Sequence, residues 1–196
     1  MGKIRDAERT KARILHAAAD AVRRAGPSVS LDAIAQEAKV SKGGLMHHFQ
    51  TREQLMLALV ENLYTAFEAS VKEALSKDDT APGRLARAYI RASFAGIEPS
   101  EEASDQLLLA QLALQPAIRR YIEELESRWH KDLAEDGLHP RMALLISAAT
   151  EGAGLGETED GPDSDRLRQL ERDLLTLTRA APAIMAVLDI ADPPRP

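Results

Sequence analysis

The chain contains no cysteine, few aromatic residues and no long apolar run, and each absence excludes a class of protein. Without cysteine there are no disulfides and no cysteine-based zinc sites, which agrees with a reducing cytoplasm. Aromatic residues make up 4% of the 196 residues, so the core is expected to be aliphatic. No apolar run approaches the roughly 20 residues of a membrane helix, and the N-terminus has no apolar signal segment. We therefore expect a globular cytoplasmic protein that does not enter a membrane.

Motifs for catalysis and metal binding are also missing. The five histidines form neither an H-E-x-x-H motif nor a cluster with cysteine, so we predict no metal site. The run from Gly152 to Gly156 reads G-x-G-x-G, but it lacks the strand that precedes a dinucleotide site and fits close helix packing better. No G-x-S-x-G nucleophile motif occurs. We therefore predict no catalytic residue, no cofactor and no enzymatic activity.

Helical periodicity accounts for every segment long enough to judge, and nothing suggests a β-hairpin. The sequence therefore predicts an all-α fold of about nine to ten helices. Pro182 is expected to break or kink the last helix before a short final turn over 183–190, and the acidic segment 157–165 is expected to be a loop. The expected helices lie over residues 6–25, 31–38, 42–49, 51–77, 80–96, 100–114, 116–136, 139–156 and 165–181.

Residues 29–57 carry the most informative pattern, which is two short helices separated by a tight turn and followed by a third helix start. Ser30 is a suitable N-cap for the first short helix, whose apolar side chains recur at i, i+3, i+4 and i+7. Ser41 can cap the second short helix, which would be anchored by Leu45 and Phe49. This arrangement is typical of a helix-turn-helix reader of DNA.

The second short helix has an outer face suited to the major groove of DNA. Lys42 lies at its start, where the helix dipole also favours phosphate. Gly43 and Gly44 allow the backbone to approach DNA without an intervening side chain, although two glycines cost a short helix roughly 1 kcal/mol each. His47 and His48 complete this face.

The distribution of charge places phosphate contacts in the same part of the chain. Residues 1–55 contain ten Lys and Arg against six Asp and Glu, whereas the remaining residues carry a net charge of −10. Thr51 and Gln54 form a capping box at the start of the third helix, and Arg52 in its first turn is placed to reach a backbone phosphate. The predicted DNA-binding residues are Ser30, Ser41, Lys42, Gly43, Gly44, His47, His48 and Arg52.

The segment VSKGGLMHHFQTREQL resembles the helix-turn-helix signature of TetR-family transcriptional regulators, over about residues 8–60. The resemblance implies a DNA-binding head over 1–50 and a ligand-binding and dimerisation domain over 51–196. It also implies a homodimer that represses by occupying a palindromic operator and is released by a small-molecule effector. The sequence identifies neither the effector nor the operator, and it leaves activation open.

Two residues depart from the family's usual pattern. Lys39 stands where the family usually has glycine, in a turn position that tends to require a positive φ, so about 1 kcal/mol of backbone strain is implied. Met46 stands where the family usually has a tyrosine that contacts phosphate, so one phosphate contact is expected to be missing or replaced. The departure at Met46 concerns the affinity for DNA rather than the mode of docking.

Scarce aromatic residues gather on the helices that would surround an effector cavity, although a lone aromatic is more often part of a core. Arg87 and Arg91 either supply the polar end of such a cavity or form a solvated helix face. The predicted pocket residues are Tyr64, Phe67, Tyr89, Phe94, Gln111 and Trp129.

Two apolar stripes near the C-terminus predict a helix-pair contribution to a four-helix dimer interface, unless both stripes pack inside one subunit. The resemblance favours the interface, because dimers of that family use their last two long helices. The predicted interface residues are Met142, Ile146, Ala149, Gly152, Ala153, Leu167, Leu170, Leu174 and Leu177.

Taken together, the residues and the resemblance predict a sequence-specific DNA-binding regulator that works as a homodimer. The alternative from another class is a helical small-molecule binding protein or enzyme that retains a vestigial DNA-binding head. Binding to a pool of palindromic DNA sequences distinguishes the two, because only the regulator retains one sequence with a steep dependence on salt.

Overall fold

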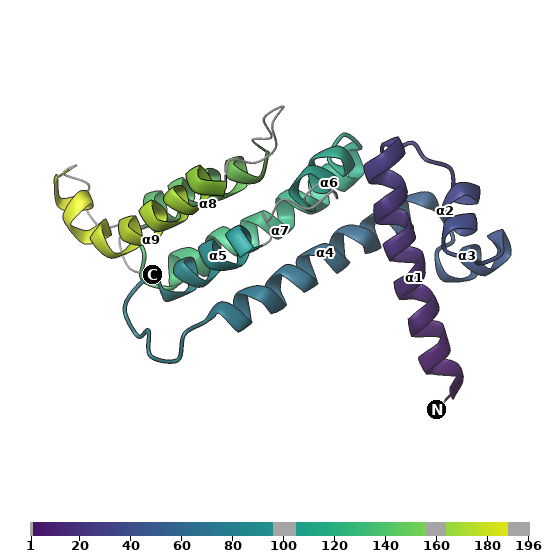
Figure 1. Cartoon of the computed structure of the whole chain (residues 1–196), viewed down its shortest axis with the longest axis horizontal. Coiled ribbons are helices and arrows are strands. Elements are labelled where there is room, and N and C mark those ends of the chain that lie inside the picture. Colours follow the sequence, from purple (N-terminus) through teal and green to yellow (C-terminus); the bar gives the residue numbers. More distant parts are fainter. Residues whose placement is uncertain (1, 96–104, 156–163, 188–196) are drawn as a thin grey trace. The chain divides into compact units, whose positions relative to one another are not determined.

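The computed structural model describes residues 2–95, 105–155 and 164–187, and the regular secondary structure of these ranges is entirely helical (Figure 1). None of the described helices is both long enough and apolar enough to cross a membrane. The helices are α1 (Gly2–Ala25), α2 (Leu31–Glu37), α3 (Lys42–His48), α4 (Arg52–Ala74), α5 (Arg84–Ala95), α6 (Asp105–Leu112), α7 (Pro116–Glu135), α8 (Pro140–Leu155) and α9 (Ser164–Val187).

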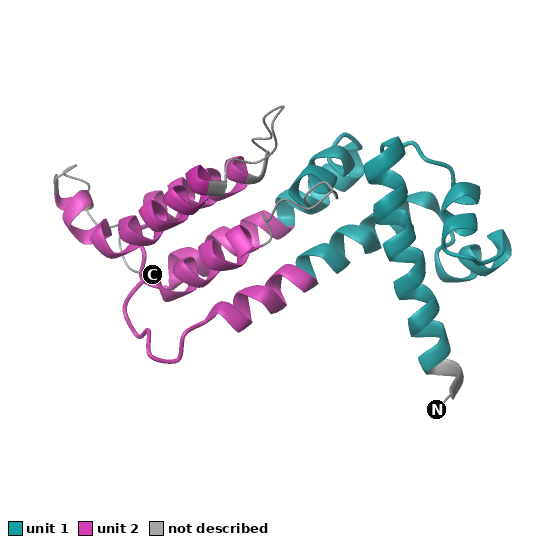
Figure 2. Ribbon diagram, viewed as in Figure 1, with its two compact units in different colours: residues 1–65, 102–124 teal, residues 66–101, 125–196 magenta. Residues whose placement is uncertain are grey.

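The chain divides into two compact units, and the long helices α4 and α7 each contribute to both (Figure 2). Unit 1 comprises residues 1–65 and 102–124, and unit 2 comprises residues 66–101 and 125–196. These units are defined by packing, so the expected functional boundary at residue 50 stays a prediction.

Unit 1 is built on α1, which contacts α2 and α6, while α2 in turn contacts α3. Its core is aliphatic, as expected, because the apolar stripe of α1 meets the inner faces of the two short helices. Ile14, Val22, Ile34, Leu45 and Leu55 are each fully buried. The first helix ends at Gly26, whose φ of 77° is one that glycine adopts without steric cost. The chain can therefore turn sharply into α2.

Unit 2 is built on α5, which packs against both α8 and α9. Its core cluster combines apolar residues from these helices with Leu133 of α7 and Leu138 beyond its end. The turn before α5 is tied to the end of α7, because the Gly83 and Leu85 amides donate to the Asp136 carbonyl and carboxylate at 2.9 and 2.5 Å. Asp136 thus satisfies amides at the start of α5, and the helix begins at Arg84, later than the sequence predicts.

Arg87 of α5 forms an internal tie in unit 2, with only 1% of its surface exposed. Its Nε and Nη2 donate to the two carboxylate oxygens of Asp79 at 2.7 and 2.6 Å. Further bonds reach the carbonyls of Ala81 and Pro82, both at 3.0 Å, and the Thr178 hydroxyl of α9 at 3.4 Å. Both sequence interpretations of Arg87 were therefore wrong, since it lines no open cavity and is not solvated.

The expected break at Pro182 was also wrong, because α9 continues through this residue to Val187. Proline removes one backbone hydrogen bond from a helix interior and typically costs about 3 kcal/mol. Burial on either side offsets that loss, since Ala181 is buried and Ile184 packs against the unit 2 core. The other expected bounds that lie within 96–104, 156–163 and 188–196 fall outside the described residues.

Candidate DNA-binding and effector sites

Both serine caps predicted for the short helices are confirmed. The Ser30 hydroxyl accepts a hydrogen bond from the Ala33 amide at 3.1 Å, and the Ser41 hydroxyl accepts one from the Gly44 amide at 3.0 Å. Each serine has the extended backbone of an N-cap. Since both hydroxyls accept from amides of the helix they cap, Ser30 and Ser41 fix where α2 and α3 begin.

The turn between α2 and α3 places Lys39 at φ 54°, which confirms the expected positive φ. Among the described residues, Lys39 is the one non-glycine residue in this left-handed region. The turn is held by hydrogen bonds from the Lys39 amide to Gln36 and from the Val40 amide to Ala35. These bonds maintain the turn against a strain of about 1 kcal/mol.

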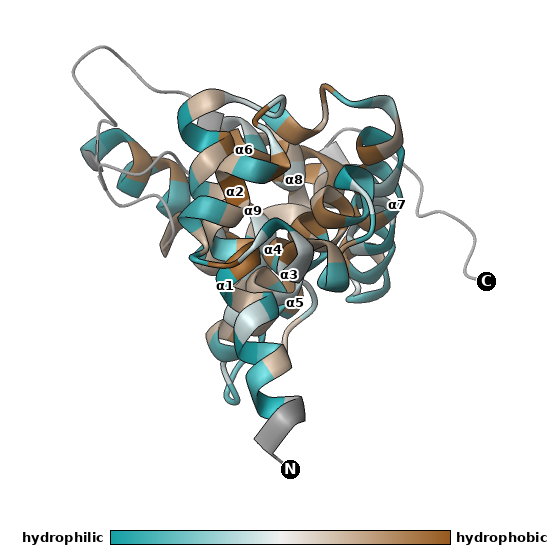
Figure 3. Cartoon of the chain, turned by 90° about the vertical axis from the view of Figure 1, so that its right-hand side faces the viewer, coloured by the Kyte–Doolittle hydropathy of each residue, from teal (hydrophilic) through white to brown (hydrophobic). Residues whose placement is uncertain are grey.

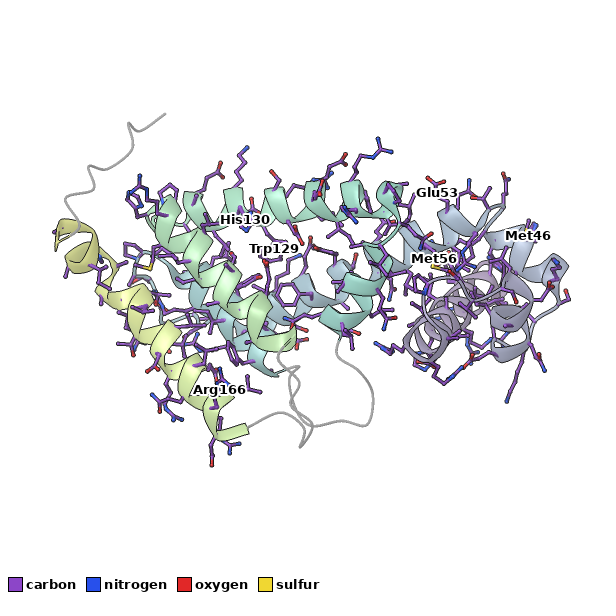
Figure 4. The ribbon with its side chains drawn as sticks, turned by 90° about the horizontal axis from the view of Figure 1, so that it is seen from above. Met46, Glu53, Met56, Trp129, His130 and Arg166 are labelled. Carbon is purple, nitrogen blue, oxygen red and sulfur yellow. The ribbon has the colours of Figure 1, made fainter. Side chains whose placement is uncertain are left out.

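The outer face of α3 is largely open to solvent. Lys42 and His47 are exposed, while Met46 and His48 are half-buried; Figure 4 marks Met46 on this helix. The Lys42 ammonium forms an exposed ion pair with Asp32 of α2 at 2.8 Å. An exposed pair of this kind contributes little to stability, so it can open when a phosphate offers the lysine a stronger partner.

The two glycines of α3 have different reasons to lack a side chain. A methyl group at Gly44 would lie 3.2 Å from the Ser41 hydroxyl, so glycine there protects the cap. At Gly43 the nearest atom to such a methyl group would be the same hydroxyl at 4.0 Å, an ordinary distance, and its φ is not positive. The described structure therefore gives no internal steric reason for glycine at position 43.

Arg52 has a structural role that the sequence did not reveal. Its guanidinium donates to the carbonyls of Pro27 and Val29, in the connection between α1 and α2, and burial lowers its pKa. It therefore ties the start of α4 to the loop before α2. Its predicted contact with a DNA phosphate stays a prediction, and that contact would have to form beside these bonds or replace them.

The predicted capping box beside Arg52 is confirmed in one half and altered in the other. The Thr51 hydroxyl accepts from the Gln54 amide at 3.1 Å, as expected. The Gln54 side chain accepts from the Gln50 amide at 3.0 Å instead of from the Thr51 amide. The Gln54 side chain thus binds the backbone of Gln50, in the connection between α3 and α4, and helps to fix the path of the chain there.

The N-terminal half of α1 adds positive charge to unit 1. Arg5, Arg9, Lys11 and Arg13 are exposed, and this part of the helix is mostly hydrophilic in Figure 3. Neighbouring phosphates would attract such a group of cations without regard to base sequence. The excess of basic residues predicted for the head is therefore available at its surface.

The residues predicted to line an effector pocket are divided between the two units. Tyr64 and Gln111 are partly buried in unit 1, and the Gln111 Oε1 is buried without a hydrogen-bond partner. Phe94 packs against the unit 2 core. Phe67, Tyr89 and Trp129, by contrast, contact one another in unit 2, so the structure brings only these three residues of the predicted set together.

Phe67, Tyr89 and Trp129 form a closed group of three rings. Their centroids lie 5.3 Å apart for Phe67 and Tyr89, 5.6 Å for Phe67 and Trp129, and 5.7 Å for Tyr89 and Trp129. The first two pairs meet edge to face, and the third is tilted. These distances are those of favourable aromatic pairs. We call this group the aromatic trio.

Two acidic side chains of α7 and α8 were missed by the sequence reasoning. Glu151 of α8 is half-buried, and burial raises its pKa, helped by the neighbouring Glu126 carboxylate and opposed by His130. Glu126, Trp129 and His130 all belong to α7, where Figure 4 marks Trp129 and His130. The spacing of three and four residues between them places them on one helix face, which is the signal that could have found Glu126.

The predicted dimer stripes were wrong for their central residues. Met142, Ile146 and Leu174 have 2%, 0% and 3% of their surfaces exposed and belong to the core of their own unit. Of the other predicted residues, Gly152 and Leu177 are exposed, and Ala149, Ala153, Leu167 and Leu170 are half-buried. The centre of each stripe therefore lies on the inner face of its helix. Periodicity alone does not tell whether an apolar face packs within its own subunit or against a second one.

A different face of α8 is open and apolar. Leu144 and Leu145 have 58% and 61% of their surfaces exposed, and Ala148 and Gly152 on the same side of the helix are also exposed. On α9, Leu177 is 38% exposed. Neighbouring exposed leucines of this kind are typical of a surface that meets a partner.

Two family sequence patterns match this chain. The pattern described as bacterial regulatory proteins, TetR family, matches residues 14–59, which contain α2 and α3. The pattern described as a tetracyclin repressor-like C-terminal domain matches residues 83–179. No curated protein sequence matches the chain significantly.

Solved structures of similar fold include a TetR-family member from Streptomyces coelicolor A3, which is 24% identical with a TM-score of 0.67 over 84% of this chain and 97% of that one. The multidrug binding protein EbrR, in complex with malachite green, is 26% identical with a TM-score of 0.65 over 84% and 96%. AibR, in complex with isovaleryl coenzyme A and operator DNA, is 21% identical with a TM-score of 0.64 over 86% and 97%.

Proposed function

The chain belongs to the TetR family of bacterial regulatory proteins, and we propose that it is a homodimeric repressor released from a palindromic operator by a small organic effector. The observation that carries the proposal is the geometry of α2, the turn and α3. Two serine caps and the Lys39 turn hold α3 with Lys42, Gly43 and His47 outward. A short helix presented in this way fits the major groove of DNA.

In the complex we propose, α3 lies in the major groove and Gly43 faces the DNA. Lys42 leaves its exposed pair with Asp32 for a phosphate, and the two histidines at the end of α3 lie near base edges or phosphates. The exposed cations of α1 add affinity that does not depend on base sequence. Ser30 and Ser41 serve the interface through the caps that position the helices. The relative AibR, which is described with operator DNA, is a precedent for this use of the fold.

We propose that two copies pair through the exposed apolar face of α8, formed by Leu144, Leu145, Ala148 and Gly152, together with Leu177 of α9. The small residues at positions 148 and 152 allow two helices to approach closely. Pairing is required by the proposed mode of binding, because a palindromic operator presents two half-sites about 34–36 Å apart. This surface replaces the buried residues Met142, Ile146 and Leu174 of the predicted interface.

The effector is proposed to bind in unit 2 beside the aromatic trio. A ligand that favours one conformation of the helices would change the affinity for DNA by the difference between its own affinities for the two conformations. EbrR, described with malachite green, and AibR, described with isovaleryl coenzyme A, are precedents for organic ligands on this fold.

Regulators of this family are in general DNA-binding proteins rather than enzymes, and we propose that this chain likewise has no enzymatic activity. Among the described residues there is no group of three His, Cys, Asp or Glu side chains that could hold a metal ion. We place its action in the cytoplasm, because the proposed partner is bacterial DNA. The alternative, a helical small-molecule binding protein with a vestigial head, predicts no preference among DNA sequences.

Selection of DNA from a random palindromic pool, at 100 to 300 mM salt, tests the proposal. The wild-type protein is expected to retain one sequence family, with an affinity that falls steeply as salt increases. A variant with Lys42→Ala and His47→Ala is expected to lose this selection while keeping its melting temperature, because both side chains are exposed. Recovery of no preferred sequence by the wild-type protein would favour the alternative.

A further inference from the structure

The Asp32 carboxylate of α2 lies beside the start of α3. Asp32 belongs to the first turn of α2, and its carboxylate is 2.8 Å from the Lys42 ammonium. The Asp32 and Lys42 side chains have 64% and 62% of their surfaces exposed, so solvent reaches both partners of this pair. Glu37, the other acidic residue of α2, is paired with Arg24 of α1 instead. Asp32 is therefore the acidic side chain that α2 presents next to the start of α3.

A carboxylate in this place opposes the binding of DNA. It accepts hydrogen bonds but has none to donate, and it carries the same sign of charge as the phosphates. It also holds the Lys42 ammonium, which the proposed complex needs for a phosphate. Lys42 therefore reaches a phosphate only by leaving Asp32, and the freed carboxylate then lies close to the DNA without a partner. An acidic residue here weakens binding to every DNA sequence unless the DNA supplies a donor.

The edges of the bases are where DNA supplies such a donor. In the major groove the amino groups of cytosine and adenine donate, whereas N7, O6 and O4 of the bases accept. Adenine places its acceptor N7 beside the amino group, so the second carboxylate oxygen is repelled there and cytosine is the better partner of an acidic side chain. A carboxylate freed from Lys42 is therefore best satisfied by a C·G base pair.

We propose that Asp32 determines sequence specificity by accepting a hydrogen bond from the amino group of a cytosine in each half-site of the operator. This inference rests on the proposed function, since it names a residue that reads the bound DNA. On DNA of unrelated sequence, Asp32 finds no correctly placed donor and contributes only repulsion. On the operator, the cytosine amino group satisfies the carboxylate that Lys42 has left. Asp32 thus increases the difference in affinity between the operator and other DNA in two ways.

Removing the carboxylate separates these two effects. Binding is measured by fluorescence anisotropy at one salt concentration, with the selected operator and with a scrambled duplex of equal length and composition. Asp32→Ala is expected to bind the scrambled duplex about threefold more tightly, because a negative charge near the phosphates is removed. It is expected to bind the operator about threefold more weakly, because the loss of the base contact outweighs the relief of repulsion. The ratio of the two affinities should therefore fall about tenfold.

Modified operators locate the base that Asp32 contacts. N4-methylcytosine still pairs with guanine, but its methyl group takes the place of the amino hydrogen that faces the major groove. Each cytosine is replaced in turn, symmetrically in both half-sites. At one position we expect the wild-type protein to lose roughly tenfold in affinity and Asp32→Ala to lose little. A loss confined to the wild type would identify a direct contact between Asp32 and that cytosine.

The matched control is Glu61→Gln, which removes one negative charge from an exposed residue of α4. Glu61 lies roughly two and a half turns into that helix. Its substitution is therefore expected to change both affinities by less than about twofold. The melting temperature of each variant verifies that it is folded.

An unchanged affinity ratio in Asp32→Ala would overturn the proposal, as would an operator half-site without a C·G pair. A wild-type protein that tolerates N4-methylcytosine at every position would also overturn it, and this result needs no variant that could misfold. Failure of the proposed function is distinguishable, because the wild-type protein would then select no DNA sequence at all, which would refute both. Selection of an operator together with an unchanged ratio would refute the role of Asp32 and leave the regulator intact.

Discussion

Replacing Asp79 by asparagine tests whether the buried Arg87 tie holds the connection between α4 and α5 in place. The wild-type pair joins two nitrogens of the guanidinium to both carboxylate oxygens, at 2.7 and 2.6 Å. Arg87 has 1% of its side chain exposed and Asp79 has 18%. Asparagine keeps one acceptor and removes the charge. The substitution therefore leaves a buried cation without its counter-charge, whose partners are the asparagine oxygen, two carbonyls and the Thr178 hydroxyl.

Loss of one partner from a buried pair typically costs about 3–5 kcal/mol, because the remaining charge is uncompensated. We expect a loss of about 3 kcal/mol, at the lower end of that range, since Asp79 is partly exposed and asparagine still accepts one hydrogen bond. The free energy of unfolding is measured by denaturant titration of Asp79→Asn and of the control Asp78→Asn. Asp78 is the exposed neighbour, so its substitution is expected to change stability by less than about 0.5 kcal/mol.

The dependence on pH gives a second readout of the same contact. Hydrogen bonding to Arg87 is the main cause that lowers the pKa of Asp79 from 3.8 to about 2. Because the pKa is depressed on folding, the contribution of Asp79 is present above pH 3.8 and is lost as the pH falls towards 2. The difference in stability between wild type and Asp79→Asn should therefore shrink over this range. Equal stabilities of Asp79→Asn and Asp78→Asn at neutral pH would refute the reasoning.

Three further variants test other parts of the account. Gly43→Ala is expected to preserve or raise the melting temperature, because alanine favours a helix by about 1 kcal/mol relative to glycine. Its affinity for the operator, measured by fluorescence anisotropy, is expected to fall. An unchanged affinity would contradict the proposed close approach of Gly43 to DNA. Lys39→Gly should raise the free energy of unfolding by up to about 1 kcal/mol by relieving the positive φ, and a loss of stability would contradict that reading. Leu144→Glu with Leu145→Glu should give folded monomers in sedimentation, because both side chains are exposed in one subunit, and dimers that persist would move the interface elsewhere.

The features that the sequence predicted well depend on interactions between residues close together along the chain. Ser30 bonds the amide three residues ahead, and Ser41 does the same. The positive φ of Lys39 follows from its place in a short turn whose pattern is recognisable. Such features are encoded within one or two helical turns, so residue type and spacing are sufficient to predict them.

The features that were missed depend on partners distant in sequence. Arg52 contacts carbonyls 25 and 23 residues earlier, and Arg87 reaches a hydroxyl 91 residues later. Periodicity located apolar stripes on α8 and α9 but could not tell whether Ile146 meets its own subunit or a second one. Burial in the folded subunit decides that question, and it moves the proposed interface to Leu144 and Leu145.

The most direct test of the central claim maps the position of α3 on DNA. Because the chain has no cysteine, Glu53→Cys gives a unique attachment site for an iron–EDTA cleavage reagent. Glu53 is exposed in the first turn of α4, just beyond α3, and is marked in Figure 4. On the selected operator, we predict two clusters of strand cleavage placed symmetrically about its centre, one for each half-site. Cleavage spread uniformly along the DNA, or confined to one side of the centre, would contradict a dimer that docks α3 into two half-sites.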